Sequence, residues 1–189
     1  SGVTNIGNSA FDSCARLSNV ILPGSVASIG VRAFADCTSL ASITIPGSVT
    51  NLGNGAFAGC TSLMAIDVDA GNLFYASLDG VLFDKGLLTL LQFPAGKAGN
   101  YLIPRGVTRI DAAAFSRATG LTQVIIANGV TNLGASAFDG CTGLASVALP
   151  DGVTRIWDYT FRSCTNLASV TIPDGVASIG NSAFYACNS

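Results

Sequence analysis

The stretch AFADCTSLASITIP, residues 33–46, decides the fold, because close copies of it return at regular distances along the chain. Three of these copies are AFAGCTSLMAIDV at 56–68, AFDGCTGLASVALP at 137–150 and TFRSCTNLASVTIP at 160–173. The phenylalanine near the start of each copy belongs to a series: Phe11, Phe34, Phe57, Phe115, Phe138, Phe161 and Phe184. Neighbouring members are 23 residues apart, except Phe57 and Phe115. A fixed period of this length indicates a solenoid of stacked repeats.

Each repeat combines two kinds of local structure. Ala33, Phe34, Cys37 and Leu40 are spaced as one face of a short helix or 3₁₀ turn. Residues 42–45 then alternate between polar and apolar side chains, which predicts a strand, and the proline after them ends it because it has no N–H for a ladder. A single repeat cannot bury its apolar side alone, so the repeats must stack.

The predicted fold is therefore an α/β solenoid with a parallel sheet on one face and short helical or 3₁₀ turns on the other. We expect one seven-stranded sheet, with the strands in register about 4.8 Å apart. The predicted strands are residues 19–22, 42–45, 65–68, 100–103, 123–126, 146–149 and 169–172. The whole chain, 1–189, is predicted to be a single solenoid.

The repeat unit IPxxVTxIGxxAFxxCxxLxxV resembles the BspA-like (Treponema-type) leucine-rich repeat, and the resemblance covers nearly the whole chain. It implies a right-handed solenoid of 23-residue leucine-rich units in a secreted or cell-surface protein, mostly of bacteria. Adhesion to host proteins and to other cells is the activity that the resemblance implies. No catalytic residue carries over, because the shared motif consists of core positions.

One unit departs from the period, because Phe57 and Phe115 are 58 residues apart, which leaves a 35-residue unit at about 69–103. Two β-prone runs there flank Asp84-Lys85-Gly86, which predicts a hairpin with Gly86 in the left-handed conformation that projects from, or folds over, the convex side. The segment also resembles a variant unit of the same family. Asp67, Asp69, Asp79 and Asp84 gather here, but the segment lacks the final Glu of a calcium-binding EF-hand loop. We interpret these aspartates as turn residues and predict no metal.

Six cysteines follow the repeat phenylalanine by three residues, and Ala118 takes that position in the remaining repeat: Cys14, Cys37, Cys60, Cys141, Cys164 and Cys187. Replacement by alanine favours small buried side chains, so we predict six buried, reduced thiols. A disulfide between neighbouring repeats is the alternative. It is disfavoured because the cysteines form two runs of three, and parallel Cβ vectors suit closure poorly. The absence of CxxC pairs and of histidine argues against zinc.

Composition excludes several classes of function. Histidine is absent, which removes the commonest general base and every His-dependent triad, so we predict no catalytic residues, no enzyme activity and no cofactor. The net charge is −2 and the nine Lys and Arg residues are scattered singly, which argues against a nucleic-acid partner. No apolar run approaches the roughly 20 residues of a membrane span. The chain begins and ends inside the repeating pattern, so we expect it to be a fragment of a longer chain.

A candidate ligand-binding patch lies where the repeat is least regular. Other units read IGNSAF or LGNGAF, whereas one reads IWDYTFR, in which a tryptophan replaces the glycine. The change is either a local repacking of one repeat or an aromatic and arginine binding site. The candidate residues are Arg155, Trp157, Tyr159, Arg162 and Tyr185. The outward strand positions are small and nearly uncharged, which favours a plain structural surface there.

These observations favour a non-enzymatic binding or adhesion module of a secreted or cell-surface bacterial protein that recognises a protein or a glycan. A structural spacer that carries another functional domain is the alternative. We expect an extracellular or cell-surface location, no membrane insertion, and end-to-end self-association of the uncapped fragment. The period also predicts an ion pair between Asp139 and Arg162, which lie one repeat apart.

Overall fold

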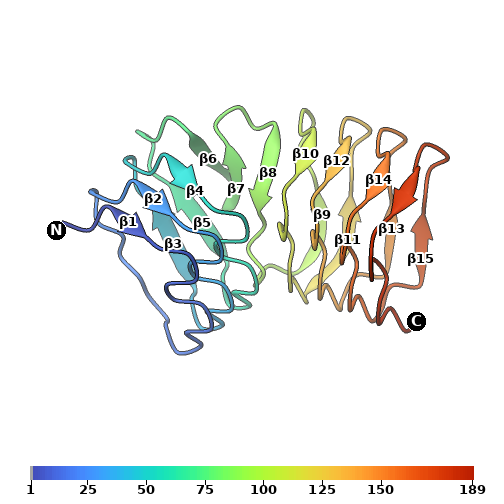
Figure 1. Ribbon diagram of the computed structural model, residues 1–189, viewed down its shortest axis with the longest axis horizontal. Helices are drawn as coiled ribbons and strands as arrows, with labels where there is room; N and C mark the ends of the chain where they lie inside the picture. Colours follow the sequence, from blue (N-terminus) through green and yellow to red (C-terminus); the bar gives the residue numbers. More distant parts are fainter. Residues whose placement is uncertain (1) are drawn as a thin grey trace.

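Two ladders of parallel strands and a ladder of tight turns form a solenoid in the computed structural model, which describes residues 2–189 (Figure 1). Ser1, the first residue of the predicted solenoid, lies outside the described residues. Figure 1 shows the coils side by side in one row, with the two chain ends at opposite ends of the row. The described residues contain no helix, so the predicted helical face is wrong and the fold is a β-solenoid.

The first ladder contains six of the seven predicted strands, in parallel and with Ser42 opposite Ala65, one repeat later. These strands are β3 (Ser42–Ile45), β5 (Ala65–Val68), β9 (Gly99–Leu102), β11 (Leu121–Ile125), β13 (Ser146–Ala148) and β15 (Ser169–Thr171). The seventh, 19–22, is not a strand, and the predicted single sheet is two: β3-β5 and β15-β13-β11-β9. The ladder is interrupted at the variant unit, because β5 and β9 belong to different sheets.

The second ladder was missed because seven of its eight strands are two residues long, too short for alternation to show. The strands are β1 (Asn5–Ile6), β2 (Ser28–Ile29), β4 (Asn51–Leu52), β8 (Thr89–Gln92), β10 (Arg109–Ile110), β12 (Asn132–Leu133), β14 (Arg155–Ile156) and β16 (Ser178–Ile179). They lie shortly before each phenylalanine, five of them directly before the glycine of an Ile-Gly or Leu-Gly pair, and their pairs are parallel, for example Ile6 with Ile29. Pairing is absent between β12 and β14, and between β4 and β8.

Stacked turns replace the predicted helices because two residues of every regular repeat adopt positive φ. These residues lie two before and two after the phenylalanine, as Arg32 (φ 54°) and Asp36 (φ 57°) do around Phe34. A left-handed residue at this spacing prevents a continuous helix. Alternate N–H groups point along the stack instead, and Phe34 N donates to Ala56 O of the next repeat at 2.8 Å. Gly55, Gly59 and Gly140 were the sequence signal for this conformation.

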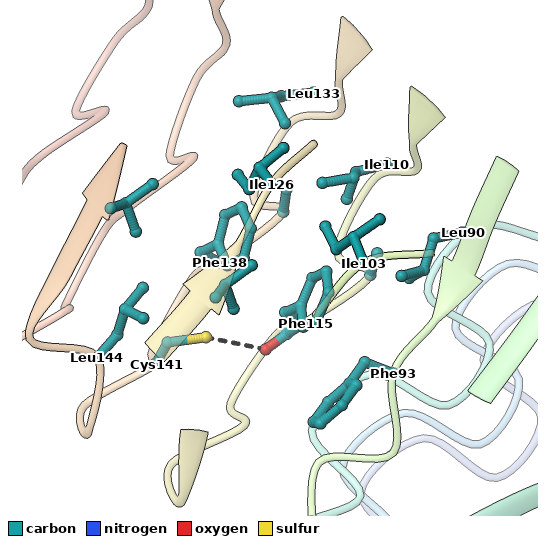
Figure 2. Close-up of a cluster of buried hydrophobic side chains, with 14 of the residues drawn as sticks. Leu90, Phe93, Ile103, Ile110, Phe115, Ile126, Leu133, Phe138, Cys141 and Leu144 are labelled. Carbon is teal, nitrogen blue, oxygen red and sulfur yellow. Dashed lines mark hydrogen bonds between the residues drawn. The ribbon is translucent and has the colours of Figure 1, made fainter. Parts of the chain in front are cut away.

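The core positions of the repeat are as predicted, and the phenylalanine rings stack along the axis (Figure 2). Phe138 stacks on Phe115 at 4.8 Å between ring centroids and on Phe161 at 5.3 Å. Phe93 takes the phenylalanine position of the variant unit, because it stacks on Phe115 at 5.0 Å. Phe93 precedes Phe115 by 22 residues and not by the 23 of the repeat, so the sequence pattern did not identify it as a repeat phenylalanine.

The variant unit contains β6 (Tyr75–Leu78), β7 (Val81–Asp84) and β8, paired antiparallel in that order. The hairpin between β7 and β8 is confirmed, but its left-handed residue is Leu87 (φ 55°) and not Gly86. Strand β8 pairs in parallel with β10 and so belongs to the second ladder. A second hairpin turns at Asp79-Gly80, both with positive φ, the signature of a two-residue type I′ turn.

Candidate functional site

The repeat with the candidate patch is also one of the two places where pairing in the second ladder is absent. In the regular repeats the glycine before the turn donates its N–H to the preceding repeat, as Gly134 does to Ile110 O and Gly180 to Ile156 O, each at 2.8 Å. Trp157 stands in this glycine column, and among residues 2–189 no such bond joins its N–H to Leu133 O. Strands β12 and β14 are unpaired at the same place.

Close packing restricts the glycine column. A Cβ atom added at Gly30 would lie 2.5 Å from Asn8 N, and one at Gly180 would lie 2.5 Å from Asp158 N. Real side chains do not approach backbone this closely, so at these glycines the regular separation of the repeats leaves no room for a Cβ atom.

Asp111 also stands in this column, and its N–H still donates to Leu90 O at 2.9 Å, so one larger residue is accepted without loss of the bond. At Trp157 this bond is missing, while the turn ladder between the same two repeats is intact, with Phe138 N to Thr160 O at 2.8 Å.

Arg155 and Trp157 form the first half of the patch. The Arg155 guanidinium carbon lies 3.9 Å from the centroid of the indole ring, which is a cation–π contact. Trp157 is 37% exposed, so the ring is half covered and one part of it faces solvent. Arg155 has no carboxylate partner among residues 2–189, and its N–H groups can donate to a ligand.

Tyr159 and Arg162 form the second half. The Arg162 guanidinium lies 4.9 Å from the Tyr159 ring and is held from the other side by Asp139, with Nε to Oδ1 at 2.8 Å and Nη2 to Oδ2 at 2.5 Å. This two-pronged pair confirms the predicted contact between neighbouring repeats, and its hydrogen bonds to Asp139 raise the pKa of Arg162. Tyr159 has φ 59°, a conformation that costs a bulky residue about 1 kcal/mol.

Tyr185 is the least attached of the five predicted residues. Its side chain is 67% exposed, and only its backbone joins the patch, where its carbonyl accepts the Ser163 N–H at 2.7 Å. The structure therefore joins the candidates into two cation–π pairs, with Tyr185 on the next repeat. Sequence reasoning did not count Asp139 as part of the patch, although the predicted ion pair with Arg162 was the signal for it.

The cysteines form a ladder of thiol hydrogen bonds. Cys37, Cys60, Cys141, Cys164 and Cys187 each donate Sγ–H to the carbonyl of the phenylalanine 26 residues earlier, at 3.0–3.1 Å. Figure 2 shows the bond from Cys141 to Phe115 O. All six cysteines are free thiols, but the prediction of burial is wrong for Cys14, which is exposed, and Cys187 is only half-buried.

Burial sets the ionisation of these thiols. It raises the pKa of Cys60 and Cys164 to about 12 and that of Cys141 well above its usual value. Such thiols are poor nucleophiles at neutral pH. Ala118 can replace cysteine because the carbonyl that would accept its thiol, Phe93 O, receives the Gln92 side-chain amide at 3.3 Å instead.

Two aspartates of the variant unit, Asp69 and Asp84, accept hydrogen bonds from backbone N–H groups of nearby turns. Asp69 Oδ1 accepts the Gly71 N–H at 2.8 Å. Asp84 Oδ1 accepts the N–H groups of Leu88 and Thr89 at 2.8 and 3.0 Å. Within residues 2–189 there is no group of three or more His, Cys, Asp or Glu side chains that could hold a metal ion.

The fold and the repeat motif define a class of protein. The model of the BspA type leucine rich repeat region, with six copies, matches residues 1–100 and 92–189. The chain therefore belongs to the BspA-type leucine-rich repeat family. A search of curated proteins found no match. No helix in residues 2–189 is long and apolar enough to cross a membrane.

Solved structures of similar proteins share the fold. The pneumococcal vaccine antigen PcpA is 30% identical with a TM-score of 0.89, over 94% of this chain and 45% of that protein. A leucine-rich cell surface protein from Faecalibacterium prausnitzii is 32% identical with a TM-score of 0.80, over 99% of this chain and 56% of that protein. A leucine-rich repeat protein from Eubacterium ventriosum, 22% identical with a TM-score of 0.54, shows the fold alone, over 100% of this chain and 82% of that protein. The chain spans about half the length of the first two.

Proposed function

We propose that the chain is a non-enzymatic binding module of a secreted or cell-surface bacterial protein, and that it recognises a protein or a glycan through the patch around Trp157. One observation carries this proposal. An exposed indole, covered on one side by an arginine, stands in a column that is glycine in five of the seven regular repeats, and the second ladder is unpaired between β12 and β14 at this place. A side chain kept at a cost to the scaffold points to a role outside the scaffold.

The chemistry of the patch suits a ligand with one apolar face and several acceptors. The uncovered part of the indole can stack on the C–H face of a sugar or on a partner's side chain. The N–H groups of Arg155 can donate to hydroxyl or carbonyl oxygens beside that face. Asp139 holds Arg162 in place, which fixes the Tyr159 ring for a second contact. The surface location is supported by the similar protein from Faecalibacterium prausnitzii, which is described as a cell surface protein.

Trp157 is the only tryptophan in the chain, so its fluorescence reports on this site alone. The first test measures retention of the purified protein on immobilised host glycoproteins. The second titrates the protein with free oligosaccharides and follows quenching of the Trp157 fluorescence. Trp157→Gly restores the glycine of the repeat, so we expect it to fold at least as well while it loses about 2 kcal/mol of binding, or roughly 30-fold in affinity.

The matched control is Phe74→Ala, which removes another exposed aromatic ring outside the patch. Loss of binding in Trp157→Gly alone supports the proposal. Unchanged binding with a less stable fold would show that Trp157 fills space and that the ligand lies elsewhere. Absence of any saturable binding would favour the alternative function, a structural spacer that carries another domain.

The two ends of the solenoid present complementary backbone groups without partners, and this supports the proposal that the chain associates end to end. At one end the carbonyls of Asn8, Ala10 and Asp12 accept no backbone N–H within residues 2–189. At the other end the N–H groups of Ser182 and Phe184 donate to no backbone carbonyl there. These are the acceptors and donors that pair between neighbouring interior repeats. Sedimentation velocity over a range of concentrations tests this, and a species that stays monomeric would contradict it.

A further inference from the structure

A groove opens where the first predicted strand fails to join the sheet. Residues 19–22 keep the expected alternation, with Val20 and Leu22 packed partly against the core and Ile21 85% exposed, yet they do not pair with β3. Figure 1 shows this blue segment splayed away from β3. The groove between them has a volume of about 610 Å³. Its lining is Asn19, Val20, Ile21, Leu22, Gly24, Ser42, Ile43, Thr44, Pro46, Gly47, Ser48 and Asp69.

The missing hydrogen bonds can be named from an interior repeat. Ala168 N donates to Ala145 O at 3.0 Å, and Leu149 N donates to Thr171 O at 3.0 Å. The equivalent pairs at the groove are Ala41 with Ser18 and Leu22 with Thr44. Neither bond exists, and within residues 2–189 no backbone hydrogen bond joins 16–24 to 39–48. Both walls of the groove therefore present unpaired backbone groups.

The separation is confined to this side of the first repeat. The turn ladder is intact, with Phe11 N to Ala33 O at 2.7 Å, and so is the second ladder, with Gly30 N to Ile6 O at 2.8 Å. The groove is thus an opening between two strand positions that are fixed at both ends. Exposed strand edges of this kind are templates for pairing with another extended chain.

We propose that this groove binds an extended polypeptide segment, which enters as an additional strand between 19–22 and β3. Only an extended backbone carries N–H and C=O groups at the spacing needed to satisfy both walls at once. Ile43 and Leu22 at the floor favour alternate apolar side chains in the segment. Asp69 is the only charged residue of the lining, so a neutral or basic segment fits better than an acidic one. This site is separate from the Trp157 patch and does not depend on it.

Hydrogen exchange measured by NMR tests the proposal. In the free protein the N–H groups of Ala41 and Leu22 should exchange at least an order of magnitude faster than those of Ala145 and Leu149, their bonded equivalents. The probe is a synthetic peptide of residues 166–173, acetylated and amidated. It should slow exchange at Ala41 and Leu22 saturably, whereas the same peptide with methylated amide nitrogens at Ala168 and Val170 should not.

A matched pair of variants locates the effect. Ser42→Trp fills the groove from an exposed position of β3 and should abolish the protection, while Ser146→Trp at the equivalent position of β13 should leave it unchanged. Slow exchange at Ala41 and Leu22 without peptide would show that 19–22 closes onto β3 in solution and would overturn the proposal. No change at millimolar peptide would also overturn it. Protection that grows with protein concentration alone would assign the groove to a second copy of the chain.

Discussion

The two halves of the solenoid are built from the same repeat, yet they have separate cores. In the N-terminal half Phe11, Phe34 and Phe57 stack at 5.0 and 5.6 Å. In the C-terminal half the stack runs from Phe93 to Phe184, and no ring contact within residues 2–189 joins Phe57 to Phe93. The buried residues accordingly form two clusters, one from Ile6 to Leu82 and one from Val81 to Ala183.

Strand β7 is the wall between the two cores. Val81 and Phe83 belong to the C-terminal cluster and Leu82 to the N-terminal one, and all three are fully buried. A strand presents alternate side chains to opposite faces, so three consecutive apolar residues can serve two cores. A continuous run of apolar residues in the sequence therefore packs against two separate cores.

The turn ladder, in contrast, passes over the variant unit. Gly59 N donates to Ser116 O at 3.3 Å, which joins the repeat of Phe57 directly to that of Phe115. Arg117 reaches across the same junction to Asp36, with Nη1 to Oδ1 at 2.8 Å. A variant unit can therefore divide the core of a solenoid while its outer turns remain continuous.

Alkaline pH should distinguish the halves most strongly. The pKa of Cys60 in the N-terminal half is raised to about 12, whereas the C-terminal half holds Cys164, also raised to about 12, and Cys141, raised well above its usual value. Above the ordinary value of 9.0 the unfolded thiols lose protons that the folded ones keep, so stability falls as pH rises from 9 towards 12 and is unaffected below 9. Each thiol contributes a slope of about 1.4 kcal/mol per pH unit.

Urea unfolding followed by Trp157 fluorescence, which reports on the C-terminal half, measures this slope. Alanine is accepted at this position of the repeat, as Ala118 shows. Cys164→Ala should therefore leave the fold intact and reduce the slope of stability against pH by the contribution of one thiol. Burial also raises the pKa of Tyr101 to about 12, so the variant must be compared with the parent chain at each pH. An unchanged slope in the variant would contradict the assignment to the thiols.

Truncation of the wall should destabilise the halves selectively. Phe83→Ala should cost about 4 kcal/mol and loosen mainly the C-terminal half, because its ring lies in that cluster. Leu82→Ala should cost about 3 kcal/mol and loosen mainly the N-terminal half. Hydrogen exchange resolved by residue measures both. If each variant loosened the two halves equally, the cores would be one cooperative unit.

Asn72 closes the N-terminal core where the variant unit begins. It is fully buried, its Nδ2 donates to Pro46 O and Val49 O at 2.8 and 3.0 Å, and its Oδ1 accepts the N–H groups of Phe74 and Tyr75 at 2.8 and 2.9 Å. Asn72→Ala leaves these four groups without their partner and should cost about 3 kcal/mol in chemical denaturation. Asn166→Ala, at an exposed site, should change stability little. A similar loss of stability in this control would show that the effect of Asn72→Ala does not come from its buried hydrogen bonds.

The smallest expected effect concerns the Arg117–Asp36 pair that crosses the junction. Both the exposure of Arg117 and the second partner of Asp36, Arg32, limit its strength, so Arg117→Met should cost at most about 1 kcal/mol. A double-mutant cycle with Asp36→Asn at low and high salt measures the coupling. Coupling that does not weaken in salt would mean that packing of the arginine stem, and not charge, holds the junction.

The candidate patch could be predicted in part. The departure of Trp157 from a glycine column was visible in the sequence, and the period placed Asp139 against Arg162. The contact of Arg155 with the indole was not predictable, because repeat spacing says which residues are neighbours but not where long side chains point. The broken pairing between β12 and β14 depends on backbone separations that a residue pattern does not contain.

The sequence by itself determined the period, the parallel stacking and the core positions, because these follow from which residues repeat and must be buried together. Only the tertiary structure decided that the AFxxC segment is a ladder of turns. The same apolar spacing fits a helix. The choice of turns depends on left-handed residues such as Arg32 and Asp36, whose N–H groups donate to backbone carbonyls of the next repeat. The tertiary structure also decided that Leu82 and Phe83 pack in different cores. Their apolar side chains predict burial, but the sequence does not say which core each one faces.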